Sequence, residues 1–243
     1  MSSSSDLILS KESLDKLTYR RSPGIVAVGG FTSEVGKTTL LCNLLRAFPG
    51  WEAIKTTRGH YRSCGKDPQA CCVTHLLEDK PVVKSGRDLT YSYGKDTGRY
   101  WDAGAGNVHW VIATDQQVEE GIKKAIERVE TSCVFIEGNS FTKYIQPDYF
   151  IMVARADDLK IKSTARSALS RVSSFYLSGE NVGCDEKELL QEFLVKANPQ
   201  AKTVQSLPVF SAQELQDLVV SIADRGFHLQ STAQANPVCG TAS

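Results

Sequence analysis

The segment that decides the fold is IVAVGGFTSEVGKTTLLCNLLRAF, residues 25–48. Its first four residues, from Ile25 to Val28, form a short apolar, β-branched run that is typical of a buried strand. The run ends at two glycines, and the stretch from Thr38 to Phe48 has the pattern of a helix. The sequence therefore predicts a strand, a glycine-bounded loop and a helix in immediate succession.

The loop between this strand and helix has the composition of a phosphate-binding loop (P-loop). The residues that we expect to bind a nucleotide there are Gly30, Phe31, Thr32, Ser33, Glu34, Val35, Gly36, Lys37, Thr38 and Thr39. Glycines let backbone N–H groups converge on phosphate oxygens, and the N-terminus of the helix adds its positive dipole. We expect Lys37 to contact the β and γ phosphates and the Thr38 hydroxyl to bind Mg²⁺.

Further apolar runs alternate with amphipathic stretches along the chain. We expect strands at 51–57, 107–113, 132–136, 149–154 and 206–210, and helices at 116–129, 159–172, 186–195 and 212–223. This alternation favours an α/β fold in which a mostly parallel sheet has helices on both faces. Together with the P-loop, it predicts a P-loop NTPase.

The expected elements belong to one nucleotide-binding domain, residues 23–228. Residues 1–22 are predicted to form a flexible N-terminal arm and residues 229–243 a disordered tail. Residues 58–95 are long, polar and cysteine-bearing, so we interpret them as an insertion between the second and third predicted strands.

The charge balance excludes several classes of partner. The chain of 243 residues has 28 Lys plus Arg against 28 Asp plus Glu, which gives no reason to expect binding to nucleic acid or to a membrane surface. Its longest apolar runs are about six residues, against the roughly 20 that a membrane helix needs. No apolar secretory segment stands in the first twenty residues. We therefore expect a cytoplasmic protein with reduced cysteines.

A carboxylate stands at the end of another predicted strand. The apolar run Val134-Phe135-Ile136 leads directly into Glu137-Gly138. Ligands collect at the carboxyl ends of the strands in an open parallel sheet, and a carboxylate there can hold Mg²⁺ directly or through water. We predict that Glu137 is the second magnesium ligand and that Lys37 and Glu137 carry catalysis by positioning and charge neutralisation. The alternative is a strand-end Glu that faces solvent.

Two short motifs bear on the choice of base. Arg155 and Asp157 stand in the segment ARADD, which resembles the Asn-Lys-x-Asp guanine motif of GTP-binding proteins. Asp oxygens can accept from N1–H and the 2-amino group of guanine, and adenine offers no matching pair of donors. Ser211 and Ala212 resemble the Ser-Ala loop whose backbone N–H meets the guanine oxygen. Together the two motifs favour GTP over ATP, although a helix cap is another common use of Asp157.

The segment GKDTGRYWDAGA, residues 94–105, resembles a segment of a known family. It is similar to the Gly-Lys-Asp-Ser/Thr-x-Arg-x-x-x-Ala-Gly-Ala stretch of the molybdopterin-guanine dinucleotide biosynthesis protein B family. Ile54-Lys55 and Ile136-Glu137-Gly138 match the same family. The five residues between Gly30 and Gly36, in contrast, resemble the P-loop of dethiobiotin synthetase.

The first resemblance implies a homodimeric protein that binds GTP and hydrolyses it weakly. Its implied role is accessory to molybdenum cofactor biosynthesis, in the attachment of the guanine nucleotide, beside a partner protein of that process or a molybdoenzyme. The P-loop spacing leaves open an ATP-dependent ligase or kinase of the dethiobiotin synthetase type. Lys37, Lys55 and Glu137 would then act on a small carboxylate or carbamate.

A cluster of cysteine and histidine residues lies in the predicted insertion. Zinc selects these side chains, and the candidate ligands are Cys64, Cys71, Cys72 and His75. Because the cluster contains no Cys-x-x-Cys pair, ordinary loop thiols are the alternative. With bound metal, a metal-chaperone NTPase becomes a third candidate function. Cys42, Cys133 and Cys184 stand in apolar stretches and are expected in the core.

Overall fold

The structure is a computed structural model that describes residues 22–59, 74–180, 182–197, 204 and 206–227. The tail predicted at 229–243 lies outside these residues, as does almost all of the arm predicted at 1–22. Cys64, Cys71 and Cys72 also lie outside them. Within the described part of the chain, no helix is long and apolar enough to cross a membrane.

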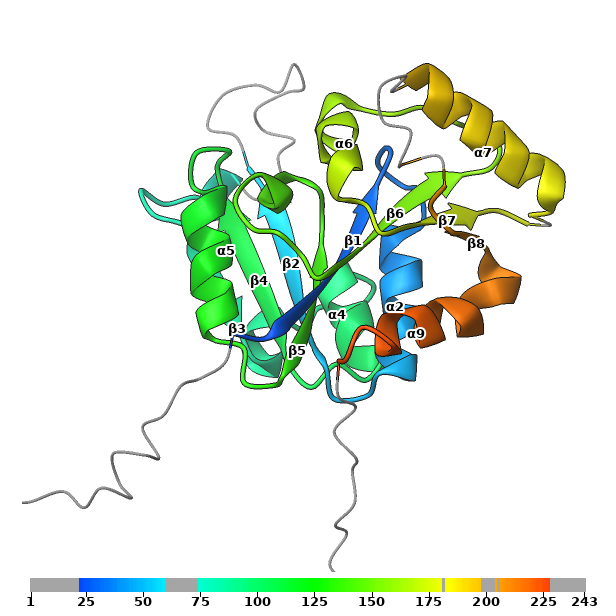
Figure 1. Cartoon of the computed structure of the whole chain (residues 1–243). Coiled ribbons are helices and arrows are strands. Elements are labelled where there is room, and N and C mark those ends of the chain that lie inside the picture. Colours follow the sequence, from blue (N-terminus) through cyan, green and yellow to red (C-terminus); the bar gives the residue numbers. More distant parts are fainter. Residues whose placement is uncertain (1–21, 60–73, 181, 198–203, 205, 228–243) are drawn as a thin grey trace, which may run out of the picture.

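An eight-stranded sheet runs through the centre of the molecule in the order β3-β4-β2-β5-β1-β6-β7-β8 (Figure 1). The strands are β1 (Gly24–Gly30), β2 (Glu52–Arg58), β3 (Val82–Ser85), β4 (Val108–Ala113), β5 (Cys133–Glu137), β6 (Tyr149–Arg155), β7 (Ser174–Ser178) and β8 (Val209–Phe210). Neighbouring strands are parallel throughout, except that β3 pairs antiparallel with β4 at one edge. The predicted mostly parallel α/β sheet is confirmed.

Helices cover both faces of this sheet, as Figure 1 shows. They are α2 (Lys37–Ala47), α3 (Arg87–Thr90), α4 (Asp96–Asp102), α5 (Val118–Glu127), α6 (Ser163–Ala168), α7 (Cys184–Ala197) and α9 (Leu215–Ala223). Short 3-10 turns are η2 (Thr74–Leu76), η3 (Ser140–Lys143), η4 (Leu169–Arg171) and η5 (Ala212–Glu214).

Alternate residues of the central strand feed two separate hydrophobic cores. Ala27 packs in the core beneath α5, α6 and α7, whereas Val26 and Val28 pack in the core beneath α2, α4 and α9. Side chains of a strand point alternately to its two faces, so an almost continuous apolar run such as β1 requires cover on both sides. With the P-loop at the end of β1, this is the P-loop NTPase fold.

Several predicted elements need correction. The sequence pattern does not predict β7, because its short apolar run directly follows a stretch that we assign to a helix at 159–172. That helix is confined to Ser163–Ala168 and the turn η4, since the chain before it folds back so that the Lys162 N–H donates to the Phe31 carbonyl. The predicted insertion at 58–95 contains β3 and α3.

One predicted core residue lies at the surface. Cys42 and Cys133 are buried as expected, but Cys184 is exposed. The helix α7 contributes Leu190 and Leu194 to the core, so its first turn lies beyond the apolar contact.

The position of α4 depends on a close contact between Gly98 and the backbone of Ser92. A Cβ atom built there would lie 2.1 Å from the carbonyl oxygen of Ser92, which is backbone and cannot swing away. We expect Gly98→Ala to cost about 1–3 kcal/mol of folding free energy, and so to lower Tm by roughly 2–12 °C in thermal unfolding. The control is Gly183→Ala, where the nearest atom is the end of the Glu186 side chain at 3.4 Å. Equal Tm values for the two variants would contradict this close packing.

Candidate functional site

The P-loop turns sharply between β1 and α2. Glu34 and Gly36 have φ angles of +60° and +90°, on either side of the buried Val35. Lys37 is the first residue of α2, and its ammonium group lies 3.1 Å from the carbonyl oxygen of Thr32, within the same loop. The loop therefore closes on itself around the N-terminal end of α2, where backbone N–H groups are free to meet an anion.

Two side chains that the sequence analysis did not single out support this loop. Asn139 is buried; its side-chain oxygen accepts from the Gly30 N–H at 2.9 Å and its amide nitrogen donates to the Gly30 carbonyl at 2.8 Å. A Cβ at Gly29 would lie 2.3 Å from the same Asn139 oxygen, so only glycine fits there. At the end of β7, the Ser178 hydroxyl donates to the Val35 carbonyl at 2.8 Å.

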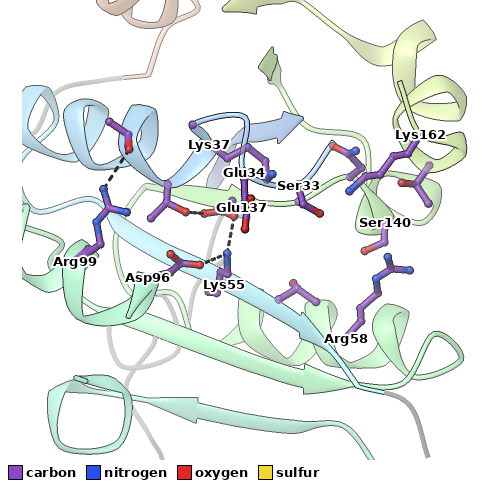
Figure 2. A pocket seen from close by; sticks show the side chains of 17 residues that line it. Ser33, Glu34, Lys37, Lys55, Arg58, Asp96, Arg99, Glu137, Ser140 and Lys162 are labelled. Atoms are coloured by element: carbon purple, nitrogen blue, oxygen red, sulfur yellow. Dashed lines mark hydrogen bonds and ion pairs between the residues drawn. The ribbon is translucent and has the colours of Figure 1, made fainter. Parts of the chain in front are cut away.

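The predicted carboxylate at the end of β5 meets the P-loop. Glu137 is 4% exposed, and one of its oxygens accepts from the Thr38 hydroxyl at 3.0 Å and from the Tyr100 hydroxyl. Its other oxygen lies 2.5 Å from the Lys55 ammonium, which also lies 2.6 Å from Asp96 (Figure 2). Glu137 therefore does not face solvent: it belongs to a cluster of Thr38, Lys55, Asp96, Tyr100 and Glu137.

The cluster is charged. Burial alone would lower the pKa of the Lys55 ammonium, but the charges of Glu137 and Asp96 outweigh burial and raise that pKa. Burial would likewise raise the pKa of Asp96, but the ammonium of Lys55 outweighs it and lowers that pKa. Burial, followed by the charge of Glu137, raises the pKa of Tyr100 well above its usual value, so the phenol stays protonated and donates its hydrogen bond.

The cluster opens into a cavity of about 540 Å³, within the usual range for ligand pockets. We call it the phosphate cavity. It is lined by Ser33, Glu34, Gly36, Lys37, Thr38, Thr39, Lys55, Thr56, Arg58, Asp96, Arg99, Glu137, Gly138, Asn139, Ser140, Lys162 and Thr164. Figure 2 shows Arg58 and Lys162 at the end away from Arg99. Five of these side chains are cationic and three are acidic, so the cavity suits a polyanion.

The ammonium of Lys37 is adapted to bind such an anion. Burial lowers the pKa of Lys37, helped by the positive charges of Lys162 and Lys55 and opposed by Glu137. A phosphate would replace this repulsion by an attractive contact and so favour the charged form.

Four of the ten predicted P-loop residues, Gly30, Phe31, Thr32 and Val35, do not line the phosphate cavity. The N–H groups of Gly30 and Phe31 donate to Asn139 and to the Val153 carbonyl, and the side chains of Phe31 and Val35 are buried in the core. Thr32 contributes its carbonyl oxygen to Lys37.

The residues predicted to recognise the base lie in two different places. A cavity of about 600 Å³, the Arg155 cavity, adjoins Gly36 and is lined by Arg155, Asp157, Ser178 and Glu180, among others. There Asp157 accepts from Arg155 through both of its oxygens, at 2.8 and 2.5 Å.

The other predicted base motif lies elsewhere. Ser211 and Ala212 do not line the phosphate cavity or the Arg155 cavity. Ser211 and Glu214 form a helix capping box, in which the Glu214 carboxylate accepts from the Ser211 N–H at 3.0 Å.

Of the candidate zinc ligands, His75 alone is described, and it is exposed in η2. Within the described ranges, no three or more His, Cys, Asp or Glu side chains gather in a way that could hold a metal ion. A zinc site at Cys64, Cys71 and Cys72 stays a prediction from the sequence.

Comparisons with known proteins add little to this geometry. No protein-family model matches the chain, and no curated protein matches it. Among solved structures, HypB from Helicobacter pylori in complex with nickel is similar at 14% identity and a TM-score of 0.49, covering 88% of this chain and 92% of that chain.

Two further solved structures are similar at lower scores. A nucleotide-binding protein from Archaeoglobus fulgidus in complex with ADP has 14% identity and a TM-score of 0.39, covering 90% of this chain and 92% of that chain. A putative plasmid partition protein from Borrelia burgdorferi bound to AMPPNP has 10% identity and a TM-score of 0.38, covering 85% and 100%. Its own strand, loop and helix give this chain the P-loop NTPase fold, with Glu137 beside the loop.

We expect Lys37→Ala to weaken binding of a nucleoside triphosphate roughly 100-fold, because charge-assisted hydrogen bonds to phosphate are lost. Tm should change little, since among the described residues the Lys37 ammonium makes one hydrogen bond, to the Thr32 carbonyl. Titration with a fluorescent triphosphate analogue measures the affinity, and Lys143→Ala, at an exposed position, is the control. Unchanged affinity in folded Lys37→Ala protein would refute the P-loop assignment.

Proposed function

We propose that this protein binds a nucleoside triphosphate together with Mg²⁺ and hydrolyses it slowly, with GTP as the preferred nucleotide. The observation that carries the proposal is the cluster of Thr38, Glu137, Asp96 and Lys55 at the mouth of the P-loop, inside a cationic cavity.

The oxygen atoms of this cluster suit a magnesium ion. The Thr38 hydroxyl and the carboxylates of Glu137 and Asp96 are hard oxygen ligands, which Mg²⁺ prefers. The same two carboxylates already hold one cation, the Lys55 ammonium, at 2.5 and 2.6 Å. Bound Mg²⁺ would neutralise charge on the β and γ phosphates. We propose Thr38 and Glu137 as magnesium ligands, as the sequence predicts, and add Asp96 to them.

Slow hydrolysis follows from the state of the carboxylates. Glu137 and Asp96 are both paired with Lys55, and the lowered pKa of Asp96 makes it a weak base near neutral pH. Neither carboxylate is therefore poised to take a proton from an attacking water. Lys37 would position the phosphates, while Arg58, Arg99 and Lys162 would add positive charge around them.

We propose that the base binds in the Arg155 cavity, and that this cavity prefers guanine. It adjoins Gly36 and holds Asp157, whose two oxygens already accept from the two parallel N–H groups of Arg155. The N1–H and 2-amino groups of guanine would offer Asp157 a similar pair of donors. Ser211 and Ala212 support this proposal only through their sequence motif.

The candidate process is the attachment of the guanine nucleotide in molybdenum cofactor biosynthesis. The segment that carries the family resemblance, residues 94–105, supplies Asp96 and Tyr100 to the cluster, and Arg99 donates to Thr39 at 3.2 Å. The resemblance therefore falls on residues of the nucleotide site. A cytoplasmic homodimer with a partner protein of this process belongs to the same proposal.

A second candidate is a kinase or ligase of the dethiobiotin synthetase type. It is favoured by the position of Lys55, which lines both the phosphate cavity and a neighbouring cavity with room for a small substrate. The metal-chaperone candidate depends on Cys64, Cys71 and Cys72, which the structure does not describe.

The role of Glu137 is tested by Glu137→Gln, which keeps the shape of the side chain and removes its charge. We expect Mg²⁺-dependent release of phosphate from GTP to fall at least about 100-fold, the usual cost of losing a group that stabilises charge in a transition state. The control is Glu119→Gln on α5, where an exposed Glu pairs with Lys123. Because Glu137 is buried, Tm is measured in parallel. A folded Glu137→Gln protein with normal turnover would refute the magnesium role.

The choice of base is tested by competition of GTP and ATP for one fluorescent analogue. GTP should win by about tenfold or more, and Asp157→Ala should remove most of the difference, because paired hydrogen bonds to a base are worth a few kcal/mol. Asp158→Ala is the neighbouring control. Equal competition by ATP and GTP in the unmodified protein would show that the base assignment is wrong.

A further inference from the structure

A further cavity, of about 670 Å³, lies beside the phosphate cavity. We call it the Trp110 cavity. It is lined by Lys55, Thr56, Thr57, Arg58, Leu89, Thr90, Tyr91, Ser92, Lys95, Asp96, Thr97 and Trp110. These residues come from the end of β2, from α3 and the loop after it, from the start of α4 and from β4. Lys55, Thr56, Arg58 and Asp96 line the phosphate cavity as well, so the two cavities adjoin.

The wall of the Trp110 cavity is unlike that of the phosphate cavity, because it carries large apolar side chains. Leu89 is 62% exposed and Tyr91 is 37% exposed, and the indole of Trp110 lies between buried and exposed. Large apolar side chains that stay open to solvent at a concave surface are typical of ligand sites.

The Trp110 ring is also held in place. Its N–H donates to the Thr57 hydroxyl at 2.8 Å, and Trp110 lies opposite Lys55 in the parallel pairing of β2 and β4. On the neighbouring side, the Trp101 N–H donates to the Thr90 hydroxyl at 2.8 Å, which fixes the end of α3. The Lys84 ammonium lies over the Trp110 ring, 5.6 Å from its centroid. A ring held in this way loses no freedom when a ligand packs against the part of it that lines the cavity.

The charges of the Trp110 cavity are mainly positive. Lys55 and Asp96 neutralise each other, which leaves Arg58 and Lys95. Arg58 pairs with Asp115, which is 60% exposed, so that contact is screened by water. Lys95 has no ion-pair partner among the residues that the structure describes. An anionic group at this cavity would meet both cations.

We propose that the Trp110 cavity binds a second small molecule, which carries a flat apolar ring and an anionic group. The ring lies against Trp110, and the anionic group faces Lys95 and Arg58. The volume of the cavity, about 670 Å³, lies near the middle of the range for ligand pockets and so suits a small molecule. Lys55 and Asp96 separate this molecule from the nucleotide phosphates. The proposal stands apart from the nucleotide role, so its failure leaves that role intact.

The test uses 2-naphthoate, which has a flat ring and one carboxylate but no phosphate. The full-length protein is labelled with ¹⁵N, and the indole N–H signals of its three tryptophans are followed during titration. Single Trp→Phe variants assign the signals. We expect a saturable shift of the Trp110 signal and none of Trp51, which is 5% exposed and packs on Phe48 and Phe135 away from the cavity.

Variants separate this site from other places where the probe could bind. Trp110→Leu should weaken naphthoate binding about tenfold, because stacking is lost. Since this variant has no Trp110 signal, its binding is measured from the Trp101 signal. Lys95→Ala should weaken it about threefold by loss of an exposed ion pair. Lys143→Ala and Lys37→Ala should leave it unchanged. An unmoved Trp110 signal, equal shifts of all three indoles, or loss of binding in Lys37→Ala would each overturn the proposal.

Discussion

The site depends on one pair of contacts, in which the Lys55 ammonium lies between the carboxylates of Glu137 and Asp96. Two carboxylates so close together repel each other, and a carboxylate that is 4% exposed is costly unless it is paired and hydrogen-bonded. Lys55 removes the repulsion, while Thr38 and Tyr100 donate to the remaining oxygen of Glu137. The contacts join four elements, β2, β5, α2 and α4, so the P-loop is fixed relative to the sheet before any nucleotide arrives.

The sheet order explains why these groups meet. β5 lies between β1 and β2, and the three strands are parallel. The P-loop, Glu137 and Lys55 therefore lie together toward the carboxyl ends of these strands. Asp96 comes from α4, whose position depends on the close approach of Gly98 to Ser92 and on the buried Tyr100. The stretch from α3 to α4 thus completes the phosphate cavity on one side and forms part of the wall of the Trp110 cavity on the other.

The sequence predicts the parts of this site that depend on contiguous residues. A strand, a glycine loop and a helix follow one another in residues 25–48, and an apolar run ends at Glu137, so both patterns are local. The pairing of Lys55 with Asp96 joins distant segments and carries no local signal, although both residues stand in the stretches that resemble a known family. Because the sequence pattern does not predict β7, it also gives no sign that Ser178 supports the P-loop. The Ser211-Ala212 motif forms a helix cap instead, because Glu214 follows it.

The proposed function requires that the cluster and a triphosphate at the P-loop hold a divalent ion together. Electron paramagnetic resonance of Mn²⁺, titrated into the protein with and without a non-hydrolysable GTP analogue, tests it most directly, since Mn²⁺ accepts the same oxygen ligands as Mg²⁺. The account predicts one tightly bound Mn²⁺ per chain with the analogue, weak binding without it, and loss of the tight site in Thr38→Val. Tight analogue binding in the presence of a chelator, with no bound Mn²⁺, would contradict it.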